Sequence, residues 1–316
     1  MADKKNKKGL SPFDPAAVSE ETLALNEAVA ESMLKEKDRW EYPPQEMRKR
    51  RNEGIGAFAA PKKSERAKDE MIGGLGVRII EPSEKPKGVY LHFHGGGFVL
   101  NHAWSMDMEL ERIARVCGLV SVSVEYRLAP EHPFPAAVED AYRAAQWLAE
   151  KGGERFGSER FFIGGESAGA NLALVALIEN PTLFKGANLV SGVYDMTTTP
   201  SALERGADSL VINHEDMKNI YKCYVPSGVN PRDPRLSPLY ARLDGLPPVL
   251  LTVGSLDPFL DDTLFLHARL GAVNSRSELA VYAGGIHCFN SFLCPLADEA
   301  NQAIYTFLKN GAAGEN

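Results

Sequence analysis

The stretch Gly165-Glu166-Ser167-Ala168-Gly169 (GESAG) stands between a short apolar run, FFIG at 161–164, and a longer one, ANLALVALI at 170–178. A serine hydroxyl is a poor nucleophile unless a tight turn holds it out of the backbone beside a base, and G-x-S-x-G predicts such a turn between a strand and a helix. The alternative is an ordinary glycine-rich turn. The flanking pattern favours Ser167 as a nucleophile, with the helix N-terminus placed to stabilise an oxyanion.

The same alternation of short and long apolar segments continues on both sides of this motif, from about Met71 onward. It is typical of a mostly parallel sheet covered by helices, an α/β fold, and the continuous apolar runs indicate strands buried on both faces. The predicted strands are Val89–Phe93, Leu119–Tyr126, Phe161–Gly164, Asn188–Val193, Val249–Val253 and Leu279–Tyr282. Helices with apolar residues every three or four positions are predicted between them, including Ala170–Ile178, Leu260–Leu270 and Asp298–Leu308.

Two segments do not fit this alternation. The first contains the predicted helices Ala16–Lys37 and Gln45–Ala59, separated by a Pro43-Pro44 break, and the second is a loop with a short helix, His214–Val225. We therefore assign residues 1–60 and 196–230 to a helical cap. The catalytic domain would then comprise residues 61–195 and 231–316.

A second glycine-rich motif, His94-Gly95-Gly96-Gly97-Phe98, follows the strand that ends at Phe93. Three consecutive glycines allow backbone N–H groups to face a cavity, as an oxyanion hole requires. We assign Gly95, Gly96 and Ala168 as the donors, with His94 and Gly97 holding the loop in shape. A phosphate-binding loop is the alternative, but neither G-x-G-x-x-G nor a G-K-[ST] ending is present.

The acid and the base of a serine triad are expected after the last strands of such a sheet, in the order Ser, acid, His. Asp257 follows the strand that ends at Val253, and His287 lies in a glycine-flanked loop after the last strand. We predict that His287 is the general base and that Asp257 orients it. Other carboxylates nearby are Asp195, Asp261 and Asp262, and the remaining histidines outside the glycine motif are interpreted as ordinary surface or core residues: His92, His102, His132, His214 and His267.

Composition narrows the class of protein further. The 316 residues carry a net charge of -7, which provides no basic surface for nucleic acid or anionic lipid. The N-terminal MADKKNKKGL is not followed by an apolar signal region, and no segment approaches a membrane span, so a cytoplasmic protein without stable membrane association is expected. Cys117, Cys223, Cys288 and Cys294 show no CxxC pair, which favours reduced thiols over a zinc site.

With HGGG at 94–97, GESAG at 165–169, LDP at 256–258 and IHCF at 286–289, the chain resembles the bacterial hormone-sensitive-lipase family of esterases, and is also similar to arylacetamide deacetylases. The run YRLAPEHPFPAA at 126–137 matches a further motif of that family. The resemblance implies an α/β-hydrolase fold, with a mostly parallel eight-stranded sheet flanked by helices beneath a two-part cap. The family's oxyanion and triad residues correspond here to His94, Gly95, Gly96, Gly97, Ser167, Ala168, Asp257 and His287.

Three positions depart from the family pattern. Asn101 and Cys288 stand where glycine is common, and Ser105 lies in a segment without the usual histidine before Asp107. None of these changes removes a catalytic group. All three can reshape the pocket and alter substrate preference.

These observations predict a carboxylesterase for short- to medium-chain acyl esters, acting on a small-molecule substrate without metal or organic cofactor. Aromatic candidates for the substrate pocket are Trp40, Tyr42, Phe58 and Trp104. An amidase or deacetylase with the same triad is an alternative reading. A non-catalytic ligand receptor is another, because the plant gibberellin receptor resembles this family but lacks the triad histidine; the presence of His287 argues against it. The resemblance also implies a homodimer through the last strand and helix.

Overall fold

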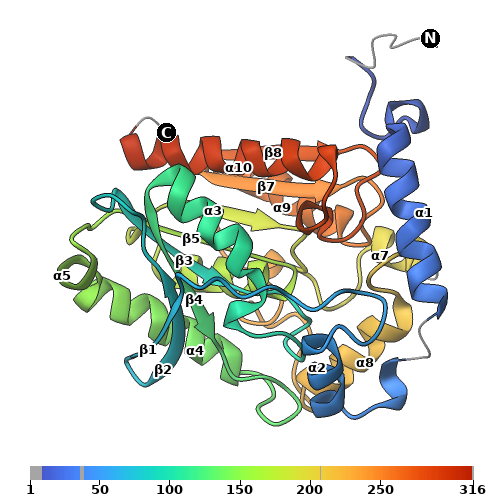
Figure 1. The fold of residues 1–316 in the computed structure, drawn as a ribbon, viewed down its shortest axis with the longest axis horizontal. Helices are drawn as coiled ribbons and strands as arrows, with labels where there is room; N and C mark the ends of the chain where they lie inside the picture. Colours follow the sequence, from blue (N-terminus) through green and yellow to red (C-terminus); the bar gives the residue numbers. More distant parts are fainter. Residues whose placement is uncertain (1–8, 36–38, 207, 315–316) are drawn as a thin grey trace.

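The computed structural model describes residues 9–35, 39–206 and 208–314 (Figure 1). Its centre is an eight-stranded sheet with the order β1-β2-β4-β3-β5-β6-β7-β8. β2 is antiparallel to both of its neighbours, and all later pairs are parallel. The strands are β1 (Lys68–Ile72), β2 (Leu75–Ile80), β3 (Gly88–Phe93), β4 (Leu119–Glu125), β5 (Phe161–Glu166), β6 (Phe184–Val190), β7 (Val249–Gly254) and β8 (Ser277–Tyr282).

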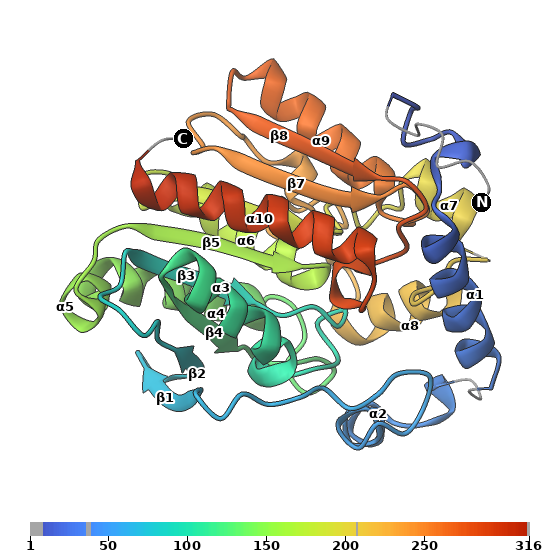
Figure 2. The ribbon, with the colours of Figure 1, turned by 45° about the horizontal axis from the view of Figure 1, so that its top comes forward.

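Helices cover both faces of the sheet (Figure 2). α3 and α10 contact each other on one face, whereas α4, α6 and α9 lie on the other. The helices are α1 (Glu20–Lys35), α2 (Pro44–Asn52), α3 (Asp107–Cys117), α4 (Ala136–Trp147), α5 (Gly153–Phe156), α6 (Ala168–Glu179), α7 (Pro200–Arg205), α8 (His214–Tyr224), α9 (Leu260–Ala272) and α10 (Pro295–Ala313). This arrangement confirms the predicted mostly parallel sheet flanked by helices.

The central strands are buried on both faces, as their continuous apolar runs predict. Along β3, Leu91 belongs to the larger hydrophobic core on one side, while Tyr90 belongs to the smaller core on the other. The six predicted strands are all present, but β6, predicted as Asn188–Val193, is shifted at both ends. β6 begins at Phe184 and ends at Val190, because the backbone leaves the extended conformation at Ser191, where φ is 49°.

The first two strands were not assigned to residue ranges from the sequence, and only the family resemblance implied a count of eight. β1 has the sequence KDEMI, and only Ile72 is buried. Such a polar edge strand carries little of the hydrophobic alternation on which strand prediction depends.

The predicted N-terminal helices are partly wrong. The helix predicted from Ala16 begins only at Glu20, because Pro15–Ala17 forms a short 3-10 turn; its predicted end, Lys37, lies outside the described residues. The helix predicted to reach Ala59 ends at Asn52. Gly54 then adopts a positive φ of 69°, a left-handed conformation that turns the chain away from the helix axis.

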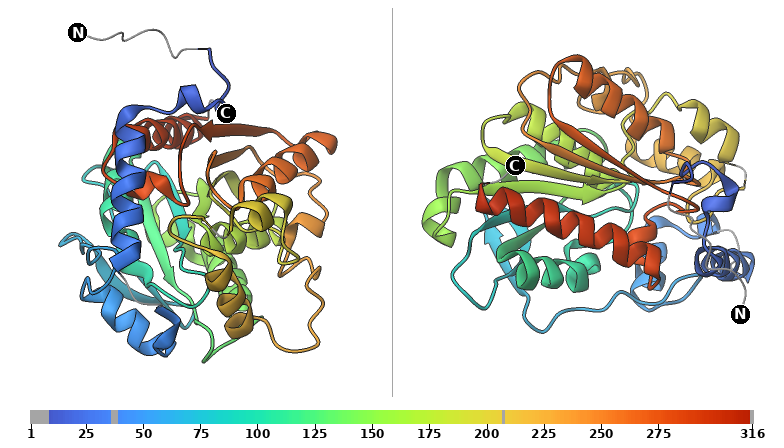
Figure 3. Two further views of the ribbon diagram at one scale, coloured as in Figure 1. Left: turned by 90° about the vertical axis from the view of Figure 1, so that its right-hand side faces the viewer. Right: turned by 90° about the horizontal axis from the view of Figure 1, so that it is seen from above.

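The two segments assigned to a cap come together at one side of the molecule (Figure 3). Arg39, between α1 and α2, forms an ion pair with Asp216 on α8 at 2.5 Å, and donates a further hydrogen bond to the carbonyl oxygen of Val211 at 2.8 Å. The second segment contains α7, a helix that the sequence did not predict, in addition to α8. The division into catalytic and cap domains at the predicted boundaries stays a prediction.

Two global features of the described ranges bear on function. None of the helices is both long enough and apolar enough to cross a membrane. In the same ranges, no group of three His, Cys, Asp or Glu side chains is arranged to hold a metal ion.

Candidate active site

Ser167 lies between β5 and α6, at the carboxyl edge of the sheet. Its backbone has φ 55° and ψ -120°, a strained conformation for a residue with a side chain. The glycines on either side make this turn possible: a Cβ at Gly165 or at Gly169 would collide with the carbonyl oxygen of Phe93 on β3. The G-x-S-x-G pattern therefore forms the predicted strand-to-helix turn, pressed directly against the neighbouring strand.

The loops after β7 and β8 bring the other two predicted triad residues to this serine. His287 Nε2 lies 3.0 Å from Ser167 Oγ, and its Nδ1 lies 3.1 and 3.2 Å from the two carboxylate oxygens of Asp257. Asp257 is completely buried and also accepts a hydrogen bond from the Phe259 N–H at 2.9 Å. The three side chains form one hydrogen-bonded row that is suited to proton transfer from the serine to the imidazole.

The surroundings of His287 change its acidity. Burial disfavours the charged imidazolium, but the charges of Cys288 and Asp257 and their hydrogen bonds outweigh it, so the pKa of His287 is raised well above its usual value. The Phe259 ring meets the imidazole edge-on, with ring centroids 5.3 Å apart. A raised pKa means that His287 becomes a base only when the pH exceeds this shifted value.

Cys288, one of the departures from the family pattern, lies beside the same imidazole. Its Sγ is 3.6 Å from His287 Nε2, the atom that also faces Ser167. The residue has a positive φ of 53°, and its N–H donates to Ser191 Oγ at 3.2 Å. The thiol is thus a second polar partner for the nitrogen that faces Ser167 Oγ.

The glycine motif lies against the serine turn. The Cβ position of Gly95 would be 3.0 Å from the Glu166 carbonyl oxygen and 3.4 Å from Ser167 Cβ. Within the described part of the chain, the N–H groups of Gly95, Gly96 and Ala168 donate no hydrogen bond to protein atoms. Unpaired amides next to a nucleophile can bind the negative oxygen of a tetrahedral intermediate.

His94 supports the glycine motif through a hydrogen bond and a ring contact. Its Nδ1–H donates to the Gly95 carbonyl oxygen at 2.8 Å, and its ring stacks on Tyr126 with centroids 4.2 Å apart. Burial lowers the pKa of His94 to about 4, so the ring is neutral at neutral pH. Asn101 donates to the same carbonyl oxygen at 3.1 Å. The departure at position 101 therefore adds a support to the loop that a glycine could not supply.

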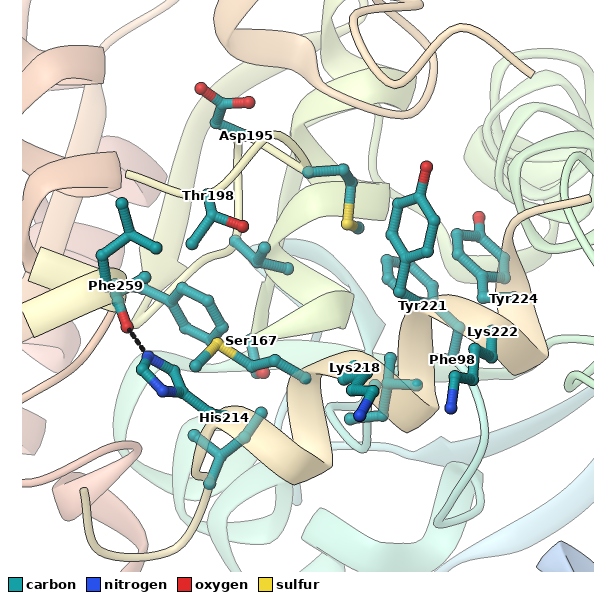
Figure 4. Close-up of a pocket in the computed structure, with 18 residues that line it drawn as sticks. Phe98, Ser167, Asp195, Thr198, His214, Lys218, Tyr221, Lys222, Tyr224 and Phe259 are labelled. Carbon is teal, nitrogen blue, oxygen red and sulfur yellow. Dashed lines mark hydrogen bonds between the residues drawn. The ribbon is translucent and has the colours of Figure 1, made fainter. Parts of the chain in front are cut away.

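The cavity beside Ser167 has a volume of about 550 Å³ (Figure 4). Its wall comes mainly from the segment between β6 and β7: α8 contributes Met217, Ile220 and Tyr221, and Ala202, Leu203 and Ile212 come from α7 and the loop that follows it. A Cβ at Gly97 would collide with Ile220, so α8 also touches the glycine motif. This helix therefore connects the cavity wall to the oxyanion loop.

The four aromatic residues predicted for the substrate pocket do not line the cavity beside Ser167. Trp40 donates to Asp216 at 2.8 Å, and Trp104 stacks on a histidine in the loop after the glycine motif. Tyr42 and Phe58 line a separate small cavity beside α2. All four are occupied in packing the N-terminal segment and the oxyanion loop, whereas aliphatic residues of α7 and α8 form the actual wall.

The competing carboxylates are engaged elsewhere. Asp262 accepts hydrogen bonds from the N–H groups of Tyr194 and Asp195 at 2.6 and 2.9 Å, and burial raises its pKa to about 7. Asp195 lines the cavity, but its carboxylate accepts from Thr197 and turns away from Ser167 (Figure 4). Asp261 accepts from the Ser201 N–H at 2.7 Å. These three residues fix the chain around the cavity wall.

Two histidines interpreted as ordinary occupy more specific places. His92 links Ser123 at 3.0 Å to Glu166 at 2.9 Å, which ties the residue before Ser167 to the middle of the sheet. His214 lines the cavity and donates to the Ala202 carbonyl oxygen at 2.8 Å. No local sequence signal distinguishes His92, because its partners lie 31 and 74 positions away.

The sequence of this chain is similar to those of known hydrolases. Residues 90–291 match the family model described as the alpha/beta hydrolase fold. The chain belongs to this family. It is 34% identical over 238 residues to the carboxylic ester hydrolase LipN of Mycobacterium tuberculosis, a match that covers 70% of this chain and 63% of LipN. It is 32% identical over 238 residues to an esterase of Acinetobacter venetianus, covering 74% of this chain and 77% of that protein.

Solved structures agree with the sequence relatives. An esterase from the bacterial hormone-sensitive lipase family has a TM-score of 0.80 and 30% identity, covering 94% of this chain and 99% of that chain. The esterase EstE5 has a TM-score of 0.83 and 28% identity, covering 94% of this chain and 100% of that chain. The predicted membership of the bacterial hormone-sensitive-lipase family is confirmed.

Proposed function

We propose that this α/β hydrolase is a carboxylesterase that cleaves short- to medium-chain acyl esters through Ser167, His287 and Asp257. The observation that carries the proposal is the single row of hydrogen bonds from Asp257 through His287 to Ser167, beside free amides of the glycine motif. The esterase names of the family relatives support the same reaction class.

In the first half of the proposed reaction, Ser167 Oγ attacks the ester carbonyl carbon while His287 Nε2 takes the serine proton. The carbonyl oxygen becomes an oxyanion, which accepts hydrogen bonds from the N–H groups of Gly95, Gly96 and Ala168. Asp257 holds the imidazole tautomer and stabilises the imidazolium. His287 then gives the proton to the leaving alcohol, and the acyl group remains on Ser167.

In the second half, a water molecule repeats the sequence on the acyl-enzyme. His287 takes a proton from the water, the new oxyanion collapses, and the proton returns to Ser167 Oγ as the carboxylic acid leaves. Each proton given up is thus recovered by the end of the cycle. The apolar wall from α7 and α8 suits the hydrocarbon part of an ester.

The test is turnover of 4-nitrophenyl butyrate by the wild type, by Ser167→Ala and by His287→Ala. Each variant should lose about 10⁶-fold in kcat, because the members of such a triad act as a unit. Ser83→Ala, an exposed serine, is the matched control and should retain full activity. Near wild-type turnover by a clean Ser167→Ala preparation would overturn the assignment.

Two further measurements separate the alternative readings. An amidase or deacetylase would turn over an anilide about as fast as its matched ester, whereas an esterase would strongly prefer the ester. A non-catalytic receptor would fail to react with a fluorophosphonate probe, which labels an activated serine. We expect ester preference, together with labelling of the wild type that is absent in Ser167→Ala.

A further inference from the structure

Helix α1 packs on the loop that carries His287. It runs along the side of the molecule next to the ends of β7 and β8 (Figures 1 and 2). Val29 on α1 shares a small hydrophobic cluster with Ile286 and Phe289, which flank the Cys288 and His287 pair in sequence. The position of the general base therefore depends on contacts with a helix from the opposite end of the chain.

Within this loop, both backbone polar groups of Gly284 are engaged. Its N–H donates to Ser255 Oγ at 2.9 Å, and its carbonyl oxygen accepts from Asn26 Nδ2 at 2.9 Å. Ser255 stands two residues before Asp257, so one bond fixes the loop to the acid and the other fixes it to α1. Gly284 is three residues before His287, and it has a positive φ of 74°.

The fit of α1 against Gly284 is close. A Cβ at Gly284 would lie 2.5 Å from Val18 Cγ1, just before α1, and 3.0 Å from Thr22 Cγ2 on α1, so this glycine also provides the space that the helix and its N-terminal approach occupy. Because α1 lies this close, Asn26 Nδ2 can reach the carbonyl oxygen of Gly284. Loop and helix are thus joined by a specific hydrogen bond inside a tightly packed surface.

The oxygen of the Asn26 side-chain amide, Oδ1, is buried without a hydrogen-bond partner among the described residues. A buried acceptor without a partner destabilises the folded protein, and an apolar residue at this position would avoid that cost. Among the described residues, the polar interaction of this side chain is the bond that it donates to the loop.

From these contacts we infer that Asn26 is a positioning residue for the proposed ester hydrolysis, on which this inference rests. By holding the Gly284 carbonyl oxygen, Asn26 keeps the loop in the position from which His287 Nε2 faces Ser167 Oγ. Asn26 touches no reacting atom. A small displacement of a base from its reaction geometry lowers the rate steeply, even when the mutated residue is remote from the chemistry.

The test compares Asn26→Asp and Asn26→Leu with the wild type. Asn26→Asp preserves the shape but replaces the amide donor by an acceptor, and Asn26→Leu removes both the donor and the unpaired acceptor. We expect kcat for 4-nitrophenyl butyrate to fall about tenfold or more in both variants, with KM changed less than twofold. The rate of labelling by a fluorophosphonate should fall in parallel. Leu34→Ala, at an 86% exposed position on the same helix, should match the wild type.

Thermal stability distinguishes positioning from simple structural support. If Asn26 only stabilised the fold, Asn26→Leu would keep its full kcat well below its melting temperature. We expect instead that Asn26→Leu melts close to the wild type and still loses turnover. If Asn26→Asp fails to fold, Asn26→Leu alone decides. Wild-type kcat in a folded Asn26→Leu protein overturns the inference. Failure of the proposed function itself would appear separately, as near wild-type turnover by Ser167→Ala.

Discussion

Two side chains approach the same nitrogen atom, His287 Nε2: Ser167 Oγ lies 3.0 Å from it and Cys288 Sγ lies 3.6 Å from it. In the neutral imidazole this nitrogen has one lone pair, so the two groups compete for it. Asp257 supplies the carboxylate in contact with the ring. At the scale of single residues, the pKa of His287 thus reflects burial, which lowers it, and the neighbouring Cys288 and Asp257, which raise it.

A first prediction concerns Cys288→Ser. The charge of Cys288 is among the causes that raise the pKa of His287, and serine does not ionise in the working pH range. Catalysis requires the neutral imidazole, so kcat/KM falls as the pH drops through the pKa of His287. We therefore expect the acid limb of the pH profile to move to lower pH in Cys288→Ser.

The matched control is Cys223→Ser, a half-buried cysteine on α8 that does not line the cavity. Its pH profile should coincide with that of the wild type. An acid limb that stays in place in Cys288→Ser would show that the thiol does not influence the base.

At the scale of elements, α2 is attached to the oxyanion region by Arg48. Its guanidinium donates to the carbonyl oxygens of Val99 at 2.7 Å and Ala129 at 2.6 Å, and it pairs with both carboxylate oxygens of Glu131 at 2.8 Å. Val99 directly follows the glycine motif. One side chain of an N-terminal helix thus joins three points of the catalytic body.

We predict that Arg48→Ala lowers the free energy of unfolding by about 2 kcal/mol at neutral pH, because two carbonyl oxygens and a carboxylate lose a charged donor. Lys49→Ala, an exposed neighbour, should change it by less than about 0.5 kcal/mol. Denaturant titration measures both variants. An Arg48→Ala protein as stable as the control would contradict the role of this attachment.

The effect of Arg48→Ala on the free energy of unfolding should also depend on pH. The hydrogen bond from Arg48 lowers the pKa of Glu131 to about 2. A depressed carboxyl pKa stabilises the folded protein above the unfolded pKa, about 4.3 for glutamate, and this contribution is lost as the pH falls toward the folded value. The stability difference between the wild type and Arg48→Ala should therefore shrink between about pH 4.5 and pH 2.

How far the sequence could predict these elements depends on the range of their contacts. GESAG, the glycine motif, Asp257 and His287 were recognised because each stands at the end of an apolar strand, where local pattern suffices. Asn26 and Gly284 are 258 positions apart, and Arg48 and Glu131 are 83 apart, so no local pattern connects them. The pocket wall was missed for a similar reason, since the aliphatic residues of α7 and α8 carry no distinctive motif.

At the scale of the whole molecule, the parallel strands β3 and β5 to β8 direct their carboxyl ends toward the same edge of the sheet. Loops after four of these strands carry the proposed oxyanion donors, nucleophile, acid and base. The N-terminal helices and the segment with α7 and α8 then gather over this edge (Figure 3). The loops at this edge of the sheet thus face a cavity whose wall comes mainly from helices outside the sheet, α7 and α8.

The cavity of about 550 Å³ beside Ser167 is partly open, and we expect acyl groups that fit within it to be preferred. Across 4-nitrophenyl esters from acetyl to palmitoyl, we expect kcat/KM to be greatest at short or medium chains and to fall for the longest. Met217→Trp, which fills part of the cavity, should move the optimum to shorter chains, while Asn219→Ala on the same helix should not. A sharp wild-type optimum at palmitoyl would point to a true lipase.

The carbonyl oxygen of Phe93 lies where side chains at both Gly165 and Gly169 would otherwise extend. A main-chain atom of a central strand cannot rotate aside, so no repacking elsewhere can accommodate a larger residue at either glycine. Phe93 also leads directly into the glycine motif, and any shift of this strand would displace both motifs at once. Changes of selectivity are therefore accessible through α7 and α8, whose side chains can be exchanged while the nucleophile turn keeps its shape.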